Sequence, residues 1–149
     1  MRLKETERAY LAGIIDGEGS IMLCKVNDRH VRVRSQYRYR PVISVGMTDP
    51  TVIKWLSSLF KSECREILDP RGNMRLPFYR WMASHKKALK FAKLILPYLK
   101  VKKEQAKLLI EYEEKQVAGH SWLTKKEEME REELHRKIKT LNRSRYLVT

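Results

Sequence analysis

The hydrophobic and polar positions of the chain change period several times, and each change marks the border of an expected element. Apolar residues recur at helical spacing near the N-terminus, at 50–60 and after residue 84, and they alternate with polar residues between these segments, most clearly at 31–45. Turn pairs and Pro or Gly residues separate these segments. The expected elements are a helix, two strands, a helix, two strands and then helices, at residues 9–17, 20–26, 31–45, 50–60, 63–68, 75–83, 85–96, 102–116 and 124–141.

This order predicts an α+β fold with an antiparallel sheet whose one face is covered by helices. A chain of 149 residues fits one domain, because single domains commonly have about 100–150 residues. We expect the domain to span residues 1–149, with a core at about 5–118 and a C-terminal helix and basic tail at 124–149. The uncovered face of the sheet would then be free to bind a partner.

The strand at 31–45 has the most informative alternation. One of its sides is apolar, and the other bears a row of guanidinium groups without an acid among them. A polar face left to solvent usually mixes both signs of charge, so the row favours contact with phosphates and guanine over a merely solvated face. A pair of strands also fits the DNA major groove. The predicted DNA-contacting residues of this strand are Arg32, Arg34, Gln36, Arg38, Arg40 and Ser44.

The second strand pair alternates less clearly. Leu76, Phe78 and Met82 suggest its core face, although Arg80 breaks the pattern. The alternative is that the aromatic residues of this strand pack within the sheet in the ordinary way. The residues that the first interpretation turns toward DNA are Arg75, Tyr79 and Trp81.

The composition points to a polyanionic partner. The chain has 32 Lys and Arg against 18 Asp and Glu, a formal net charge of +14, so nucleic acid is expected, with an anionic membrane surface as the alternative. No apolar run is long enough to span a bilayer and the N-terminus lacks a secretory signal, so we expect an intracellular protein of the cytoplasm, nucleoid or an organelle. Cys24 and Cys64 lack the paired spacing of a zinc site, and no organic cofactor is expected.

The helix near the N-terminus ends in two acids set between glycines, Asp-Gly-Glu-Gly at residues 16–19. The helix dipole disfavours carboxylates at a C-terminal end unless a cation is present. Ala9, Gly13 and Gly17 recur four residues apart and leave one face of the helix without bulk, so another backbone can approach it closely. The alternative is an amphipathic helix that runs through a Gly-rich turn into a strand.

Residues 11–19, Leu-Ala-Gly-Ile-Ile-Asp-Gly-Glu-Gly, resemble the signature of the LAGLIDADG homing endonucleases. The resemblance implies an αββαββα fold with a saddle-shaped antiparallel sheet. The motif occurs once, as in the members that act as homodimers. In the family the motif helices of two subunits pack together, and the interface residues implied here are Ala9, Ala12, Gly13 and Asp16.

The resemblance also assigns the metal site. In the family the final acid of the motif binds a divalent metal at the DNA, which makes Glu18 a metal ligand and a catalytic residue, with the carbonyl of Gly17 beside it. Asp16 is expected to have a structural role, as an acceptor for the backbone of the turn or of the partner helix. The implied cofactor is Mg²⁺ or another hard divalent cation, such as Mn²⁺, or Ca²⁺ in a complex that does not cleave.

A second resemblance lies at residues 96–106, where the family carries a Pro-aromatic-Leu-x-x-Lys pattern. The lysine matched by Lys102 sits by the active site in the family, and Lys100 and Lys103 are neighbouring alternatives. Otherwise a lysine in a basic protein is a solvated surface charge. Asp49 aligns with a polar residue near the cleavage site, which would make it catalytic, but it also fits the N-cap of the following helix.

Together these residues imply an intron-encoded, site-specific homing endonuclease that binds double-stranded DNA as a homodimer, away from any membrane. It would cut both strands of a long, near-palindromic site by metal-dependent hydrolysis. The alternatives are a noncatalytic protein of the same fold that binds DNA or RNA, such as an intron maturase or a regulator, and a plain RNA-binding module. The basic tail is either a solvated end or contacts phosphates through Lys139, Arg143 and Arg145.

Overall fold

The computed structural model describes residues 2–27, 37–62, 64–67, 77–116 and 124–144. The helices are α1 (Glu5–Glu18), α2 (Pro50–Phe60), α3 (His85–Ile95), the 3₁₀ helix η1 (Leu96–Tyr98), α4 (Lys103–Glu114) and α5 (Lys125–Ser144). The strands are β1 (Gly19–Asn27), β2 (Tyr37–Met47), β3 (Cys64–Ile67) and β4 (Phe78–Ser84). The longer helices and the strands follow the predicted order. None of the described helices has the length and apolar character needed to cross a membrane.

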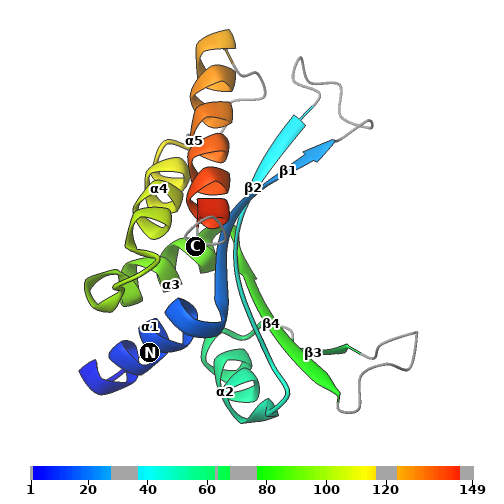
Figure 1. The fold of residues 1–149 in the computed structure, drawn as a ribbon, viewed down its shortest axis with the longest axis vertical. Coiled ribbons are helices and arrows are strands. Elements are labelled where there is room, and N and C mark those ends of the chain that lie inside the picture. Colours follow the sequence, from blue (N-terminus) through cyan, green and yellow to red (C-terminus); the bar gives the residue numbers. More distant parts are fainter. Residues whose placement is uncertain (1, 28–36, 63, 68–76, 117–123, 145–149) are drawn as a thin grey trace.

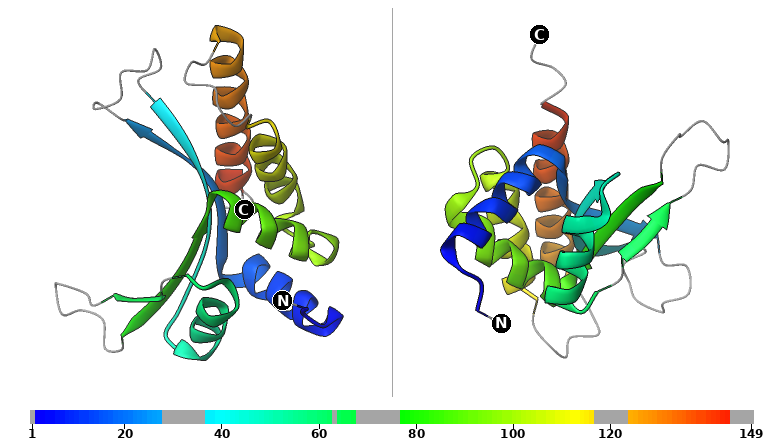
Figure 2. Two further views of the ribbon diagram at one scale, coloured as in Figure 1. Left: turned by 180° about the vertical axis from the view of Figure 1, so that it is seen from behind. Right: turned by 90° about the horizontal axis from the view of Figure 1, so that it is seen from below.

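The four strands form one antiparallel sheet in the order β1-β2-β4-β3. The helices lie together on one side of this curved sheet, and the other side is open (Figure 1). The view from behind shows the same arrangement (Figure 2). The predicted α+β architecture, an antiparallel sheet with helices on one face, is therefore confirmed.

The register of β2 against β4 determines which face of each strand is buried. Val45 lies opposite Trp81 and both are buried, because residues paired across a sheet point to the same face. The Trp81 ring packs against Phe60 and Phe91, with ring centroids 5.6 Å and 5.0 Å away, and its Nε1 donates a hydrogen bond to Ser62 Oγ at 2.5 Å. These rings form the core where α2 and α3 cover the sheet.

The predicted phase of the second strand pair is wrong. Trp81 has no exposed surface, and Tyr79 packs half-buried against the same core, so both point away from the open face of the sheet. Met82, assigned to the core, is instead 39% exposed on the open face. Hydropathy alone does not determine which side of β4 faces the core, because large side chains occur on both sides. The register against β2 determines it. Arg75 lies outside the described residues.

The motif residues lie in α1 and at its junction with β1. Leu11, Ala12 and Ile15 are buried, and the N–H of Gly19 donates to the Ile15 carbonyl at the helix end. A Cβ placed on Gly19 would lie 2.7 Å from Ile15 Cδ1 and 2.8 Å from its Cα, so this tight exit requires glycine. The exit leads directly into β1, and Glu18 therefore stands at the junction of helix and sheet.

α5 covers the free edge of β1. Asn142 Nδ2 donates to the carbonyl of Ile21 at 2.9 Å, and His135 Nδ1 is 2.7 Å from the carbonyl of Leu23. Because a carbonyl only accepts, Nδ1 of His135 carries the proton. These side chains satisfy backbone groups that an edge strand otherwise exposes to pairing with another chain.

Candidate nucleic-acid interface and metal site

The open face of the sheet carries the guanidinium groups of β2. Arg38 and Arg40 are exposed and Ser44 is half-buried on this side, while Tyr39 and Ile43 on the other side are buried. The alternation of the sequence therefore assigned the two faces of β2 correctly. The predicted contact residues Arg32, Arg34 and Gln36 lie outside the described residues.

A basic hollow that the sequence did not reveal lies across β2, β3 and β4. Arg65 and Arg80 are directly opposite each other on neighbouring strands, and with Arg40 they line a cavity of about 670 Å³. Lys61 and Lys87 lie at the same cavity. Arg80 was the one signal of this hollow in the sequence, because it breaks the predicted alternation. With the phase of β4 corrected, Arg80 lies on the open face of the sheet.

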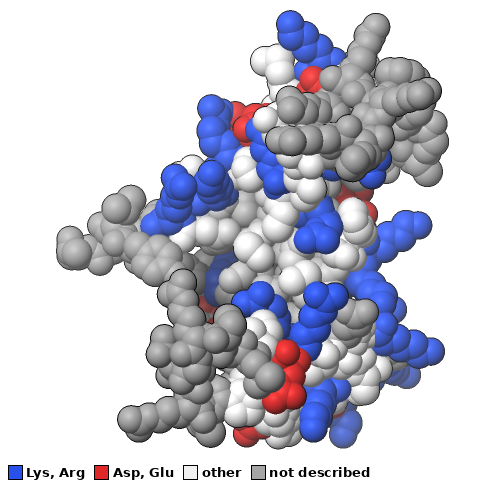
Figure 3. Space-filling view, turned by 90° about the vertical axis from the view of Figure 1, so that its right-hand side faces the viewer, with Lys and Arg blue, Asp and Glu red and all other residues white. Residues whose placement is uncertain are grey.

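The space-filling view of this side shows mainly Lys and Arg among the charged side chains of the described residues (Figure 3). Two arginines opposite each other on adjacent strands concentrate positive charge on this face. A bound polyanion would be attracted to it. The open face is therefore a surface with the charge that a nucleic-acid backbone requires.

Asp16 joins the end of α1 to the segment before α4. Its carboxylate accepts hydrogen bonds from the backbone N–H groups of Lys100 at 2.8 Å, Val101 at 3.2 Å and Lys102 at 2.9 Å. The side chain is thus held within its own chain, by the backbone of a turn. This agrees with the structural role expected of it, and its assignment to the dimer interface stays a prediction.

Lys102 also joins these two segments, because its side chain reaches from the segment before α4 to the end of α1. Its side chain is only 5% exposed, and Nζ donates to the carbonyls of Ile15 at 2.6 Å, Asp16 at 3.3 Å and Gly19. The last carbonyls of a helix have no partner within the helix and carry partial negative charge, so a buried ammonium stabilises this end of α1. Lys100 and Lys103, the two alternatives, are exposed.

Glu18 and Gly17 are exposed beside this fixed helix end. A carboxylate and a backbone carbonyl are the oxygen ligands that Mg²⁺ takes, and Mg²⁺ keeps several waters, so a partial shell of this kind fits it. The described residues contain no group of three or more His, Cys, Asp or Glu that would complete a shell. Water, phosphate oxygens or a second subunit would have to supply the remaining ligands.

Glu18 opens into a cavity of about 650 Å³ between α1, β1 and α5. Lys139 and Arg143, predicted only as tail contacts to phosphate, line this same cavity, as does Lys102. Arg145 lies outside the described residues. Cys24 also lines the cavity, and burial raises the pKa of its thiol despite the opposing effect of Arg40. The cavity therefore combines one acid with several cations and a thiol that stays protonated.

Asp49 has the geometry of an N-cap. Its Oδ1 accepts a hydrogen bond from the N–H of Thr51 at 2.8 Å, and Pro50 occupies the first position of α2. These hydrogen bonds from Thr51 hold the pKa of Asp49 below its ordinary value. Asp49 is not among the described residues that line the Glu18 cavity. Capping explains this aspartate fully, and its catalytic role stays a prediction.

The exposed side of α1 has small residues at two of its positions. Ala9 and Gly13 are exposed, and a Cβ placed on Gly13 would meet nothing within 4 Å. Ala12 is fully buried in the core, which corrects its assignment to the dimer interface. Tyr10, on the same side of the helix, is 51% exposed, and Val101 next to Asp16 is 58% exposed. Large apolar side chains thus border the small residues.

Comparison with solved structures finds this fold in several homing endonucleases. I-CvuI bound to DNA in the presence of Mg matches with a TM-score of 0.73 and 21% identity, over 92% of this chain and 82% of that chain. The archaeal intron-encoded I-Vdi141I, complexed with DNA, matches with a TM-score of 0.74 and 19% identity, over 92% and 84%. I-TnaI matches with a TM-score of 0.62 and 20% identity, over 97% and 99%.

Neither a protein-family model nor a curated protein matches the sequence. The fold comparison and the motif are separate observations, because the first uses the path of the backbone and the second uses the identity of nine residues. Both lead to the same proteins. The chain therefore has the fold of the LAGLIDADG homing endonucleases, the family whose signature residues 11–19 resemble.

Proposed function

We propose that the protein is a homodimeric, divalent-metal-dependent, site-specific endonuclease that cuts both strands of a long, near-palindromic DNA site inside the cell. The observation that carries the proposal is the position of Glu18, an exposed carboxylate at the fixed end of α1, in a cavity that also holds Lys139 and Arg143. The basic open face of the sheet lies on the same molecule. I-CvuI and I-Vdi141I, which have this fold, are bound to DNA, which supports the substrate class.

Glu18 and the carbonyl of Gly17 would hold Mg²⁺, and I-CvuI has been solved with both Mg and Ca. Bound there, the ion would offset the negative charge that grows on the phosphate and supply an acidified water. Lys102 keeps the helix end that carries Glu18 in place through its three carbonyl contacts. Lys139 and Arg143 would hold the phosphate next to Glu18.

The number of acids favours a homodimer. The motif supplies one Glu18 per chain, and a second copy of the chain would supply a second site for the other strand. Packing two α1 helices through Ala9 and Gly13 would bring the two Glu18 side chains close together. A two-fold symmetric dimer reads a near-palindromic site, with one sheet on each half and a length of about two helical turns.

The decisive experiment is incubation with duplex DNA that spans the insertion site of the protein's own gene. We expect both strands to be cut with Mg²⁺ and neither with EDTA. Tight duplex binding without cutting in Mg²⁺ or Mn²⁺ would favour the noncatalytic alternative, a maturase or regulator, for which the incomplete ligand set of the described residues is the supporting observation. A strong preference for folded RNA over duplex DNA would favour the RNA-binding module.

Replacing Gly13 by Leu tests the dimer interface. Because nothing lies within 4 Å of a Cβ at this position, the monomer accommodates the side chain, and leucine favours a helix over glycine by about 0.8 kcal/mol. We expect a folded protein that sediments as a monomer where the wild type is a dimer, and that no longer cuts both strands.

Thr140→Leu is the matched control, because it adds a leucine to an exposed position of a different helix, at a residue that does not line the Glu18 cavity. It should change neither the sedimentation nor the cleavage. A Gly13→Leu protein that remains an active dimer would place the interface on another surface.

A further inference from the structure

α5 has two stripes that face the rest of the protein. Leu134 and Ile138 form the first and are buried in the core, where α5 packs on α4. The second stripe faces β1 and lines the Glu18 cavity. Its members, which share one side of the helix through their spacing, are His135, Lys139, Asn142 and Arg143.

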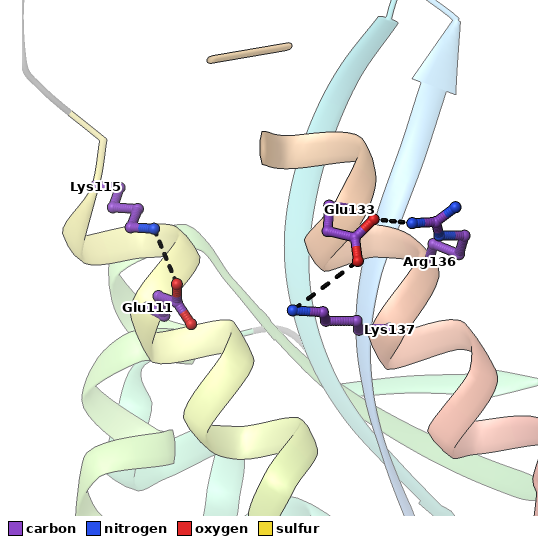
Figure 4. Close-up of polar contacts among 5 residues, drawn as sticks. All are labelled: Glu111, Lys115, Glu133, Arg136 and Lys137. Carbon is purple, nitrogen blue, oxygen red and sulfur yellow. Dashed lines mark hydrogen bonds and ion pairs between the residues drawn. The ribbon is translucent and has the colours of Figure 1, made fainter. Parts of the chain in front are cut away.

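Two cations on the outer side of α5, Arg136 and Lys137, are already paired. Glu133 pairs with Arg136 and, at 3.9 Å, with Lys137, and α4 has a pair of the same kind (Figure 4). Lys139 and Arg143 form no ion pair with another described residue. The side of α5 that faces the cavity therefore holds two cations that a bound anion could pair with.

Asn142 fixes this side of the helix. Its Nδ2 donates to the carbonyl of Ile21 in β1 at 2.9 Å, and its Oδ1 accepts from Nε2 of Gln105 in α4 at 3.3 Å. Gln105 is itself buried. The single amide thus joins three elements, and both of its groups are engaged where α5 lies against β1. Lys139 and Arg143 lie on the adjoining turns.

We propose that Asn142 is a positioning residue, which seats the end of α5 so that Lys139 and Arg143 bind a DNA phosphate beside Glu18. The inference rests on the proposed function for the identity of the anion. It makes α5 a wall of the active site, because the rotation set by Asn142 decides whether the two cations face the cavity or the solvent.

The test measures how duplex binding depends on salt, in Ca²⁺, with a duplex of about 20–30 base pairs. Each phosphate contact contributes about 0.9 to the slope of log K against log salt, so Lys139→Gln/Arg143→Gln should lower the slope by about 1.8 per chain. Arg136→Gln/Lys137→Gln is the matched control, since it removes the same charge from the same helix but on the paired side. Its slope should stay within about 0.4 of the wild type.

Asn142→Leu distinguishes positioning from simple stabilisation. If Asn142 acts through the two cations, the slope falls in this variant as well, and combining it with Lys139→Gln/Arg143→Gln causes no further fall. The rate of single-turnover cleavage should fall about tenfold in Asn142→Leu and in Lys139→Gln/Arg143→Gln, and combining the substitutions should cause no further fall. The cation variant changes only exposed side chains and is expected to unfold at the wild-type temperature.

Additive losses, or an equal loss of slope in the control pair, would overturn the proposal. The slope needs no cleavage, so the two proposals fail separately. If the wild type binds DNA but does not cut it, and the slopes are as expected, the proposed endonuclease function is rejected and the positioning role of Asn142 is kept. If the wild type cuts DNA but Lys139→Gln/Arg143→Gln leaves the slope unchanged, the endonuclease function is kept and the positioning role of Asn142 is rejected.

Discussion

Glu18→Gln is expected to reduce the rate of DNA cleavage by at least ~10³-fold, because loss of a metal-held Lewis acid costs several kcal/mol and about 1.4 kcal/mol corresponds to a factor of ten. DNA affinity in Ca²⁺-free buffer should remain within about threefold of the wild type, since Glu18 adds no cation to the binding surface. Gel-shift titration and single-turnover cleavage measure the two quantities. Glu18 is exposed, so the fold should tolerate the amide.

The control for this substitution is Glu104→Gln. Glu104 is also an exposed glutamate, in the first turn of α4, and among the described residues its carboxylate pairs with Lys107 at 2.9 Å. Exposed pairs of this kind contribute little, about 0–1 kcal/mol, so binding and cleavage should both be unchanged. Cutting by Glu18→Gln at the wild-type rate would exclude Glu18 as the metal ligand.

The features that the sequence predicted correctly are those determined by local chemistry. The order of helices and strands followed from period and from turn residues, and Asp49 was correctly expected as the cap of α2. The two faces of β2 were assigned because one of them is apolar without interruption. The motif at residues 11–19 identified the fold, because its glycines and acids are unusual at a helix end.

The features it missed depend on contacts between distant segments. The phase of β4 required its pairing with β2, where Val45 opposite Trp81 puts both residues in the core. Ala12 has no property in the sequence that separates it from Ala9, and only the packed helix shows that one is buried and the other exposed. The approach of Lys139 to Glu18 joins residues 121 positions apart and depends on how α5 lies along β1.

Lys102 is the second residue whose loss should have a large effect, and its burial changes the role expected for it. The ammonium binds carbonyls of Ile15, Asp16 and Gly19, so it acts on the end of α1 and, through that end, on the position of Glu18. Lys102→Met keeps most of the side-chain volume and removes the charge. The carbonyls then remain buried without this donor, which should lower the free energy of unfolding by about 1–3 kcal/mol.

Cleavage by Lys102→Met should fall ~10²-fold even at temperatures where the variant is fully folded, because small displacements of a metal ligand carry costs of that size. Lys100→Met and Lys103→Met are matched controls, since they make the same substitution at exposed neighbours and should lower duplex affinity slightly without this loss of rate. Urea unfolding, gel-shift titration and single-turnover cleavage separate the three effects. If Lys102→Met unfolds more easily but cuts at the wild-type rate when folded, the lysine stabilises α1 without positioning Glu18. If Lys100→Met or Lys103→Met shows the larger loss of rate, the active-site lysine is the exposed one, and the buried contacts of Lys102 serve the fold alone.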